Sequence, residues 1–248
     1  ILTFLCILIP VYVLGMGIYQ WAVNTIRTDI SNSMISQCSY FLEKFEGDIE
    51  RIQKLQNNVL VDEDLNDLVN KASVISSYQK QAAMQRLQNR LITINDSNKV
   101  IKNVRAHIPA INKTIESSGR IDNLAEEDFD YFSRTNMLPG NQMIYRNGDF
   151  YLIAATTFLD THNEQYVPYL IDICISGTEV KNVLKDLETY KSGGSLLLDS
   201  ETGVAAVADS ENEISQRMVS TLKSNGIKPE KGVKSIGLNG KRYLMAYV

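Results

Sequence analysis

The stretch Asn147-Gly148-Asp149-Phe150-Tyr151-Leu152-Ile153-Ala154 decides the fold, because its pattern recurs as Asn239-Gly240-Lys241-Arg242-Tyr243-Leu244-Met245-Ala246. Both copies read N-G-x-x-Y-L-x-A. Asn-Gly suits a type I′ turn, in which both central residues need a positive φ, and apolar flanks are typical of the two arms of a hairpin. The sequence therefore predicts two β-hairpins in corresponding positions.

The elements expected before each copy also correspond. Before the first we predict strand Val100–His107, a turn at Pro109-Ala110, strand Lys113–Glu116 and helix Glu126–Arg134. Before the second we predict strand Ser195–Leu198, a turn at 201–203, strand Val204–Ala208 and helix Glu213–Ser224. Two tandem copies of one small α+β module explain this order. Two unrelated hairpins with the same turn are the alternative.

The two copies differ on their C-terminal side. After Ala154 a loop over Asp160–Gln165 leads into the apolar run Tyr166–Ser176, whereas after Ala246 only two residues remain. A sheet that lacks its last strand has an open edge. We therefore expect the second module to be incomplete and the chain, which begins at Ile1 without Met, to be part of a longer protein.

The N-terminal segment is uncharged up to Ile26, although the whole chain of 248 residues carries 25 basic and 29 acidic ones. The run Ile1–Val23 is long enough to cross a hydrocarbon core of about 30 Å. Tyr19 and Trp21 lie where interfacial aromatic residues are expected. We predict a transmembrane helix over 1–23. A signal peptide and a buried core helix are the alternatives.

A long amphipathic helix is predicted directly after this segment, from Asn24 to Leu60. Its apolar residues recur every three or four positions and form one stripe: Ile30, Met34, Cys38, Phe41, Phe45, Ile49, Ile52, Leu55 and Val59. We interpret this helix as a spine that packs on the sheets and transmits motion; an ordinary core helix is the alternative. Further helices are expected at Glu63–Lys71, Ser76–Thr93 and, between the modules, Gly177–Tyr190.

Motifs for catalysis, metals and nucleic acids are missing from the sequence. The net charge is −4, and no basic stripe favours nucleic acid. Two scattered histidines, His107 and His162, predict no metal site, and no nucleotide-binding loop or nucleophile motif is present. We predict binding without catalytic residues, cofactor or metal. Cys38 and Cys174 are expected to be buried thiols, with a disulfide between them as the alternative.

Strand periodicity suggests which residues share a face. In Tyr166–Ser176 the odd positions from Val167 to Ile175 form an apolar face suited to the long helix, and Asp172 lies on the opposite face. In the strand at 100–108, Arg105 and His107 likewise alternate with apolar residues. Arg105 and Asp172 could then share one concave face. A structural ion pair or an exposed sheet face is the alternative.

The order of the predicted elements resembles the extracellular double-Cache region of bacterial transmembrane receptors. Within that group it is most similar to YesM-like sensor histidine kinases. Three stretches carry the resemblance: the helix Phe41–Gln56, the strand residues Val104–Pro109, and Tyr169–Ser176 running into Thr178-Glu179-Val180. The resemblance implies an α+β fold. In the fold that the resemblance implies, an N-terminal transmembrane helix continues into the helical spine. Two tandem PAS-like (double Cache) antiparallel-sheet modules follow, the second of them incomplete.

The same resemblance implies domain boundaries and a function. The boundaries are 1–23 for the transmembrane helix, 24–98 for the spine and accessory helices, 99–177 for the membrane-distal Cache module and 178–248 for the membrane-proximal one. The function is the ligand-sensing region of a two-component sensor histidine kinase in the cell membrane, extracellular from about residue 24. A chemotaxis receptor with the same ectodomain is one alternative, and a membrane-anchored envelope enzyme is another.

The implied partners are a small polar solute, carbohydrate-related by resemblance, together with membrane lipid and a second copy of the chain in a homodimer. The amino-acid-binding subfamily carries an Arg-x-Trp-Tyr signature, but the matching residues 130–136 contain no Trp. Only the strand aspartate matches, as Asp172. That departure argues against an amino-acid ligand.

We expect the ligand between the first sheet and the helix and loop at Glu126–Asn141. The candidate ligand-binding residues are Asp172, Arg105, His107, Tyr131, Arg134 and Tyr145. Because the partner charge of Asp172 would be partly solvated in an open pocket, Asp172→Ala is expected to abolish the ligand response with only a modest loss of stability.

Overall fold

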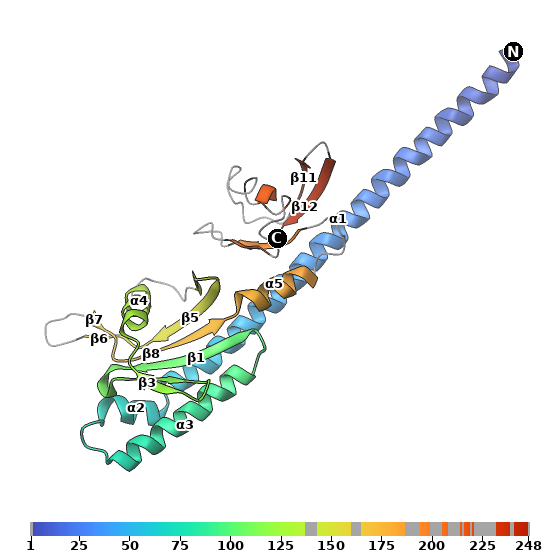
Figure 1. Cartoon of the computed structure of the whole chain (residues 1–248). Coiled ribbons are helices and arrows are strands. Elements are labelled where there is room, and N and C mark those ends of the chain that lie inside the picture. Colours follow the sequence, from blue (N-terminus) through green and yellow to red (C-terminus); the bar gives the residue numbers. More distant parts are fainter. Residues whose placement is uncertain are drawn as a thin grey trace. The chain divides into compact units, whose positions relative to one another are not determined.

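The computed structural model describes residues 2–136, 143–159, 165–186, 194–198, 205–207, 214, 216–218, 220, 232–238 and 241–247. They divide into two compact parts, Glu46–Asp209 and a second part made of Ile1–Phe45 and Ser210–Val248. The helices are α1 (Leu2–Leu60), α2 (Glu63–Asn70), α3 (Ser77–Asp96), η1 (Pro109–Ile111), α4 (Glu126–Asn136) and α5 (Gly177–Asp186). Figure 1 shows the elements in chain order.

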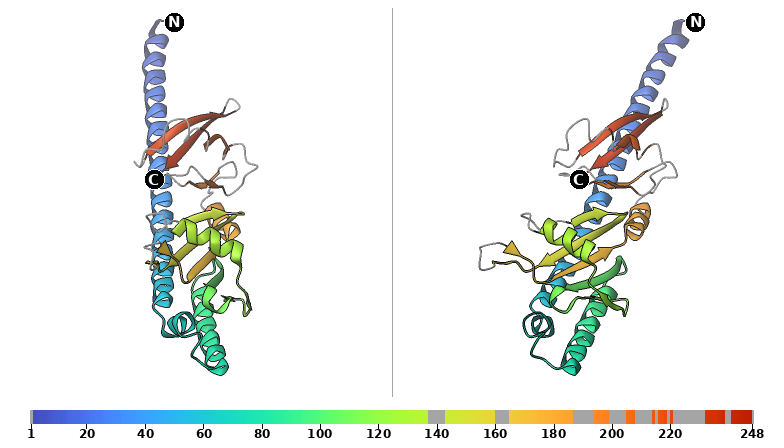
Figure 2. Two further views of the ribbon diagram at one scale, coloured as in Figure 1. Left: turned by 90° about the vertical axis from the view of Figure 1, so that its left-hand side faces the viewer. Right: turned by 60° about the vertical axis from the view of Figure 1, so that its left-hand side comes forward.

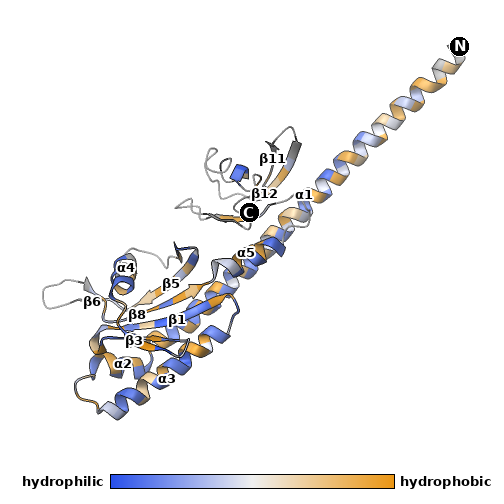
Figure 3. Ribbon diagram, in the orientation of Figure 1, coloured by the Kyte–Doolittle hydropathy of each residue, from blue (hydrophilic) through white to orange (hydrophobic). Residues whose placement is uncertain are grey.

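Helix α1 is continuous from the apolar N-terminal segment to Leu60, as the sequence predicts for the spine. It is the one helix in the described residues long and apolar enough to cross a membrane. Apolar residues predominate in its first turns (Figure 3). Large side chains there, among them Leu14 and Trp21, are exposed, which does not fit the alternative of a buried core helix.

Helices α2 and α3 begin where the sequence provides caps. Asp62 accepts hydrogen bonds from the backbone N–H groups of Asp64 and Leu65 at the start of α2. Ser76 and Gln79 form a capping box at the start of α3. The predicted bounds of α2 differ by one residue, and α3 continues three residues beyond its predicted end.

The first module is one six-stranded antiparallel sheet in the order β3-β2-β1-β8-β5-β4. Its strands are β1 (Ile101–Ile108), β2 (Lys113–Glu116), β3 (Ile121–Asn123), β4 (Met143–Arg146), β5 (Asp149–Ala155) and β8 (Leu170–Ile175). The order brings β8 to the centre, between β1 and β5. The predicted PAS-like antiparallel sheet is present in the first module, with β3 and β4 as its edge strands.

The Asn-Gly motif forms the predicted turn between β4 and β5. Asn147 and Gly148 have φ values of 54° and 87°, and Arg146 pairs with Asp149 across the turn. The start of α5 approaches this turn closely: a Cβ on Gly177 would lie 1.8 Å from the carbonyl oxygen of Gly148. Only glycine fits at that contact, because the obstacle is backbone.

Helices cover both faces of this sheet. Helix α4 packs on one face, where Phe132 lies in a buried cluster with Ile153 and Leu170. The last turns of α1 and the length of α3 cover the other face, and Figure 2 shows α4 on the side of the sheet away from them. All six residues of β8 are buried. The core therefore extends from both sides of one central strand.

The position of Val167 differs from the face pattern predicted for the strand Tyr166–Ser176. Val167 packs in the α4-side cluster with Leu170 and not on the face of Ile171. The reason is that β8 begins only at Leu170, so the alternation of faces does not extend back to 167. The preceding residues Gln165–Tyr166 form β7 instead, paired with β6 at Phe158–Leu159, a small hairpin that the sequence did not predict.

Within 178–248, the region predicted as the second module, the structure describes two strand pairs at the predicted positions, the first in the part Glu46–Asp209 and the second in the other part. β9 (Leu196–Leu198) pairs with β10 (Ala205–Val207), and β11 (Gly232–Leu238) pairs with β12 (Lys241–Tyr247). Leu238 pairs with Lys241, as a two-residue turn requires, although the turn itself lies outside the described residues. Most of the predicted helix Glu213–Ser224 also lies outside them. The two pairs form separate sheets, so the module lacks a described counterpart of β8.

Candidate functional site

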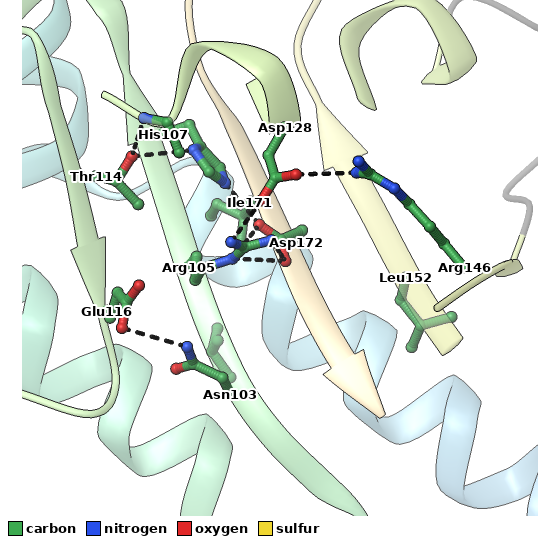
Figure 4. Close-up of polar contacts among 12 residues, drawn as sticks. Asn103, Arg105, His107, Thr114, Glu116, Asp128, Arg146, Leu152, Ile171 and Asp172 are labelled. Carbon is green, nitrogen blue, oxygen red and sulfur yellow. Dashed lines mark hydrogen bonds and ion pairs between the residues drawn. The ribbon is translucent and has the colours of Figure 1, made fainter. Parts of the chain in front are cut away.

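A cluster of ionisable side chains lies on the α4 face of the first sheet, across strands β1 and β8. Arg105 and Asp172 are direct cross-strand partners in these antiparallel strands. Alternation along β1 places Arg105 and His107 on this face and the buried Val104, Ala106 and Ile108 on the other. Figure 4 shows the side chains. The predicted pairing of Arg105 with Asp172 is present.

Asp172 is fully buried and accepts hydrogen bonds from two neighbours. His107 Nε2 lies 2.7 Å from Asp172 Oδ1. Arg105 Nε lies 3.2 Å from each carboxylate oxygen, and Arg105 Nη2 lies 3.1 Å from Oδ2. A buried carboxylate is tolerated only when charge and hydrogen bonds compensate it, and charge-assisted, forked contacts with arginine are the strongest of this kind.

Thr114 on β2 continues the cluster to the start of α4. Its Oγ1 lies 3.1 Å from His107 Nδ1 and accepts a hydrogen bond of 3.1 Å from the backbone N–H of Ala125. The hydroxyl proton is then free to go to Nδ1, which favours the His107 tautomer that donates from Nε2 to Asp172. Thr114 thus ties the residue preceding α4 to the sheet.

A second carboxylate, Asp128 of α4, bridges two arginines. Arg105 Nη1 lies 2.8 Å from Asp128 Oδ2, and Arg146 Nη1 lies 2.9 Å from Asp128 Oδ1. The guanidinium carbon of Arg146 lies 4.5 Å from the ring centroid of Tyr131, which is a cation–π distance. We refer to Asp172, Arg105, His107, Thr114, Asp128 and Arg146 as the polar cluster.

The electrostatics of the polar cluster follow from this pairing. Burial alone would lower the pKa of Arg105, but the charge of Asp172 and the contact with Asp128 outweigh it and hold that pKa above its ordinary value. Burial would raise the pKa of Asp128, but Arg105 and Arg146 hold it below the usual range. Arg105 and Asp128 are therefore both charged at neutral pH.

The predicted site residues fall into three groups. Asp172, Arg105 and His107 lie together in the polar cluster, and Tyr131 touches it through Arg146. Arg134 is exposed in the last turn of α4. Tyr145 is the cross-strand partner of Phe150, with the two ring centroids 4.9 Å apart and the rings tilted by 51°, on the face opposite Ile144 and Arg146. Placing Tyr145 with Asp172 was therefore wrong, because strand alternation turns it to the other side.

Sequence reasoning missed Thr114, Asp128 and Arg146. Arg146 carried a usable signal, since the Asn-Gly turn that follows it fixes the phase of β4. Asp128 and Thr114 carried none, because the packing of α4 on the sheet is a tertiary contact. Among the residues that the structure describes, no group of His, Cys, Asp and Glu could hold a metal ion.

The expected solvation of the cluster also needs correction. The Arg105 side chain is 15 % exposed and that of His107 is 0 % exposed, so the partners of Asp172 are not partly solvated. Removing the Asp172 carboxylate leaves buried donors unpaired, which is strongly destabilising. Because the assumed solvation is not present, we now expect a larger loss of stability for Asp172→Ala than the sequence alone suggested.

The disulfide alternative is wrong as well, since Cys38 and Cys174 are both free thiols. Cys174 lies on β8 two residues from Asp172 and is buried. Burial raises the pKa of its thiol to about 11. A thiol with so high a pKa is protonated at neutral pH and chemically inert.

The spine is connected to β8 directly opposite the polar cluster. Gln56 of α1 is buried, and its Nε2 donates hydrogen bonds to the carbonyl oxygens of Ile171 (2.8 Å) and Leu152 (3.0 Å). Ile171 adjoins Asp172 in sequence. Near the end of α1, Tyr169 donates a hydrogen bond of 2.9 Å to the carbonyl oxygen of Leu60. Consecutive residues of β8 therefore contact the polar cluster on one face and the spine on the other.

Comparison with known proteins shows similarity in structure alone. No family model matches the chain, and no curated protein matches it. A crystal structure described as the extracellular domain of histidine kinase vpHK1S-Z8 is similar with a TM-score of 0.53 at 12 % identity, covering 88 % of each chain. A domain of a sensory box/GGDEF family protein from Vibrio parahaemolyticus has a TM-score of 0.52 at 12 % identity, covering 87 % of this chain and 88 % of that one. At this identity, the similarity establishes the fold.

Proposed function

We propose that this chain is the ligand-sensing region of a membrane-bound two-component sensor histidine kinase of the double-Cache, YesM-like type. Helix α1 would anchor it in the lipid bilayer, with the residues from about 24 onward outside the cell. The fold supports this proposal, since it is similar over most of its length to a domain described as the extracellular part of a histidine kinase. The apolar, exposed start of α1 supports the anchor.

The observation that carries the proposal is the double contact of β8. Asp172 presents its carboxylate to the polar cluster, while the carbonyl of the adjacent Ile171 accepts a hydrogen bond from Gln56 of the spine. If β8 shifts so that Asp172 makes different contacts, the hydrogen bond from Gln56 to the carbonyl of Ile171 changes as well. A ligand that favours one arrangement therefore biases the position of α1, which is all that signalling requires thermodynamically.

The proposed ligand is a small polar solute that binds at the polar cluster. Arg105, held in place by the buried Asp172 and His107, would orient it, with Tyr131 and Arg134 at the α4 side. A cluster of convergent polar groups among apolar residues such as Phe132 and Ile153 is typical of small-molecule sites. A carbohydrate-related solute follows from the YesM-like resemblance. The active form would be a homodimer in which two spines lie in the same membrane.

Thermal unfolding of the full chain in detergent micelles tests this function. Circular dichroism would follow unfolding with sugars, amino acids and organic acids added one class at a time. A ligand that binds only the folded state stabilises it by about 2.7 kcal/mol at a hundredfold excess over Kd. We expect a saturable rise in Tm for at least one class.

A matched pair of variants locates the binding. Arg146→Ala removes an arginine of the polar cluster, and Arg86→Ala removes an exposed arginine that pairs with Asp64 at the other end of the same part. We expect Arg146→Ala to lose the ligand-induced rise and Arg86→Ala to keep it. No rise in the wild-type chain with any class would contradict the proposed function.

A further inference from the structure

The feature from which we infer more is the position of the Asp128 carboxylate. Its two oxygens contact two different guanidinium groups, Arg105 through Oδ2 and Arg146 through Oδ1. Those arginines lie on β1 and β4, which are separated in the sheet by β8 and β5. The carboxylate that joins them comes from α4, outside the sheet. Figure 4 shows Asp128 between the two arginines.

Exposure separates this position from the rest of the polar cluster. The side chains of Asp128 and Arg146 are 28 % and 30 % exposed, whereas Asp172 is 0 % exposed. A small solute can therefore reach the position of Asp128 from solvent without opening the core. Asp172, by contrast, is enclosed by Arg105 and His107, and no solute can reach its carboxylate from solvent.

Charge balance defines what could replace Asp128. With Asp128 in place, two carboxylates face the two arginines, and their formal charges cancel. Moving Asp128 away leaves Asp172 alone against Arg105 and Arg146, so the site gains one net positive charge. A partly buried, uncompensated guanidinium is costly. The vacated position therefore selects an anion.

We propose that Asp128 is a tethered stand-in for a carboxylate of the ligand, and that a carboxylate-bearing solute binds by displacing it from Arg105 and Arg146. This inference rests on the proposed function and names its ligand class. A carboxylate fits because guanidinium groups recognise its planar pair of oxygens through directed N–H donors. Tyr131 covers the face of the Arg146 guanidinium and leaves its N–H edge to the anion.

Displacement would also release α4 from the sheet on its polar side. Asp128 makes the ion pairs of α4 with β1 and β4, while Phe129 and Phe132 pack on the apolar cluster. The tethered carboxylate is an intramolecular competitor at an effective concentration on the order of millimolar. The ligand must exceed that competition, so Asp128 sets the concentration at which the sensor responds.

Chemical rescue tests this inference on the full chain. Asp128→Ala removes the tethered carboxylate, and we expect a lower Tm than that of wild type. Added acetate should restore most of the loss with saturation, because it fills the vacated position. Acetamide, a neutral molecule of the same shape, should restore nothing. Equal effects of acetate and acetamide would overturn the proposal.

Three further rescue measurements test whether acetate acts at the position of Asp128. Adding Arg146→Ala to Asp128→Ala should abolish the rescue, since one of the two guanidinium groups is then gone. Asp64→Ala leaves Arg86 without a carboxylate and Arg90 with Asp62 alone, and because both arginines are more exposed than Arg105 and Arg146, this variant should show a much weaker response to acetate. Rescue by sulfate as large as that by acetate would overturn the assignment to carboxylates.

The outcomes distinguish this inference from the proposed function. If the compound screen finds a neutral ligand while acetate fails to rescue Asp128→Ala, sensing stands and the carboxylate class is wrong. If acetate rescues the variant but no compound class stabilises wild type, the anion position stands and the sensing function is wrong.

Discussion

Asp64 and Asp172 are two aspartates of the same compact part that hold similar partners in different surroundings. Asp64 of α2 pairs with Arg86 and Arg90 of α3, whose side chains are 58 % and 41 % exposed. Asp172 pairs with Arg105 and His107, at 15 % and 0 %. Water and salt weaken the first set of pairs, and the second set is shielded from both.

The difference indicates separate roles. The pairs of Asp64 tie two helices together at the surface, where the energetic cost of the charges is small. The pairs of Asp172 lie in a sheet core that apolar residues could fill with equal or greater stability. Buried charges at that position are therefore poorly explained by stability. They fit the proposed site, in which Asp172 and His107 hold Arg105 in position.

The largest expected effect is on the stability of Asp172→Ala. The change leaves His107 Nε2 without its acceptor and Arg105 with Asp128 as its remaining carboxylate, and it should lower the free energy of unfolding by about 3 kcal/mol. Asp64→Ala should cost about 1 kcal/mol, since its arginines regain water. Urea denaturation of both variants, with Asp172→Asn as a milder change, measures the difference. Equal losses at the two sites would remove the distinction between them.

The second effect concerns the link from β8 to the spine. Gln56→Leu removes the donor to the carbonyls of Ile171 and Leu152 and should cost about 1–3 kcal/mol. Gln88 on α3 is a matched control, because its Nε2 also donates to two carbonyls, those of Glu116 and Arg120, at a less buried position. Urea denaturation should show a smaller loss for Gln88→Leu, and the reverse order would contradict the account.

The third effect is on the pH dependence of stability. Arg86 lowers the pKa of Asp64, and Arg105 and Arg146 lower that of Asp128 against the effect of burial. A carboxyl whose pKa is lower in the folded chain stabilises fully above its unfolded pKa of about 3.9 and loses that contribution as pH falls through the folded pKa. We therefore expect stability to fall below about pH 4.

Asparagine variants assign that pH dependence. Urea denaturation at a series of acidic pH values should give a shallower slope for Asp64→Asn and for Asp128→Asn than for wild type. A slope that neither variant changes would show that other carboxyls are responsible.

The sequence predicted the part of the site that strand alternation determines. A charged residue within an apolar strand, such as Asp172, must face a partner, and the matching pattern of Arg105 and His107 supplied one. The sheet and the continuous spine followed from the repeat and from the helical stripe. These features are local, or repeat in a way that a single chain reveals.

The remaining features depended on tertiary contacts. Asp128 enters the site only because α4 packs on the sheet, and nothing in its helix distinguishes it from Glu126 or Asp130. Tyr145 was chosen for its chemistry, whereas the phase of β4 favours Arg146. The three-residue edge strand β3 has too few residues for any periodicity to show.

The smallest effect expected is on the salt sensitivity of the two sites. The coupling of Asp64 with the exposed Arg86 should be small and should weaken as sodium chloride is added. The coupling of Asp172 with Arg105 should change little, because the pair is buried. Double-mutant cycles at low and high salt measure both quantities, and equal salt sensitivity would place the two pairs in the same environment.

Amide hydrogen exchange of the full chain tests the central claim most directly, that binding at the polar cluster alters the spine. Exchange would be compared with and without the compound that most raises Tm. We expect a change in both Glu126–Asn136 and the last turns of α1 at 50–60, with none in Ser77–Asp96. A change confined to Glu126–Asn136, with identical exchange at 50–60, would contradict the claim.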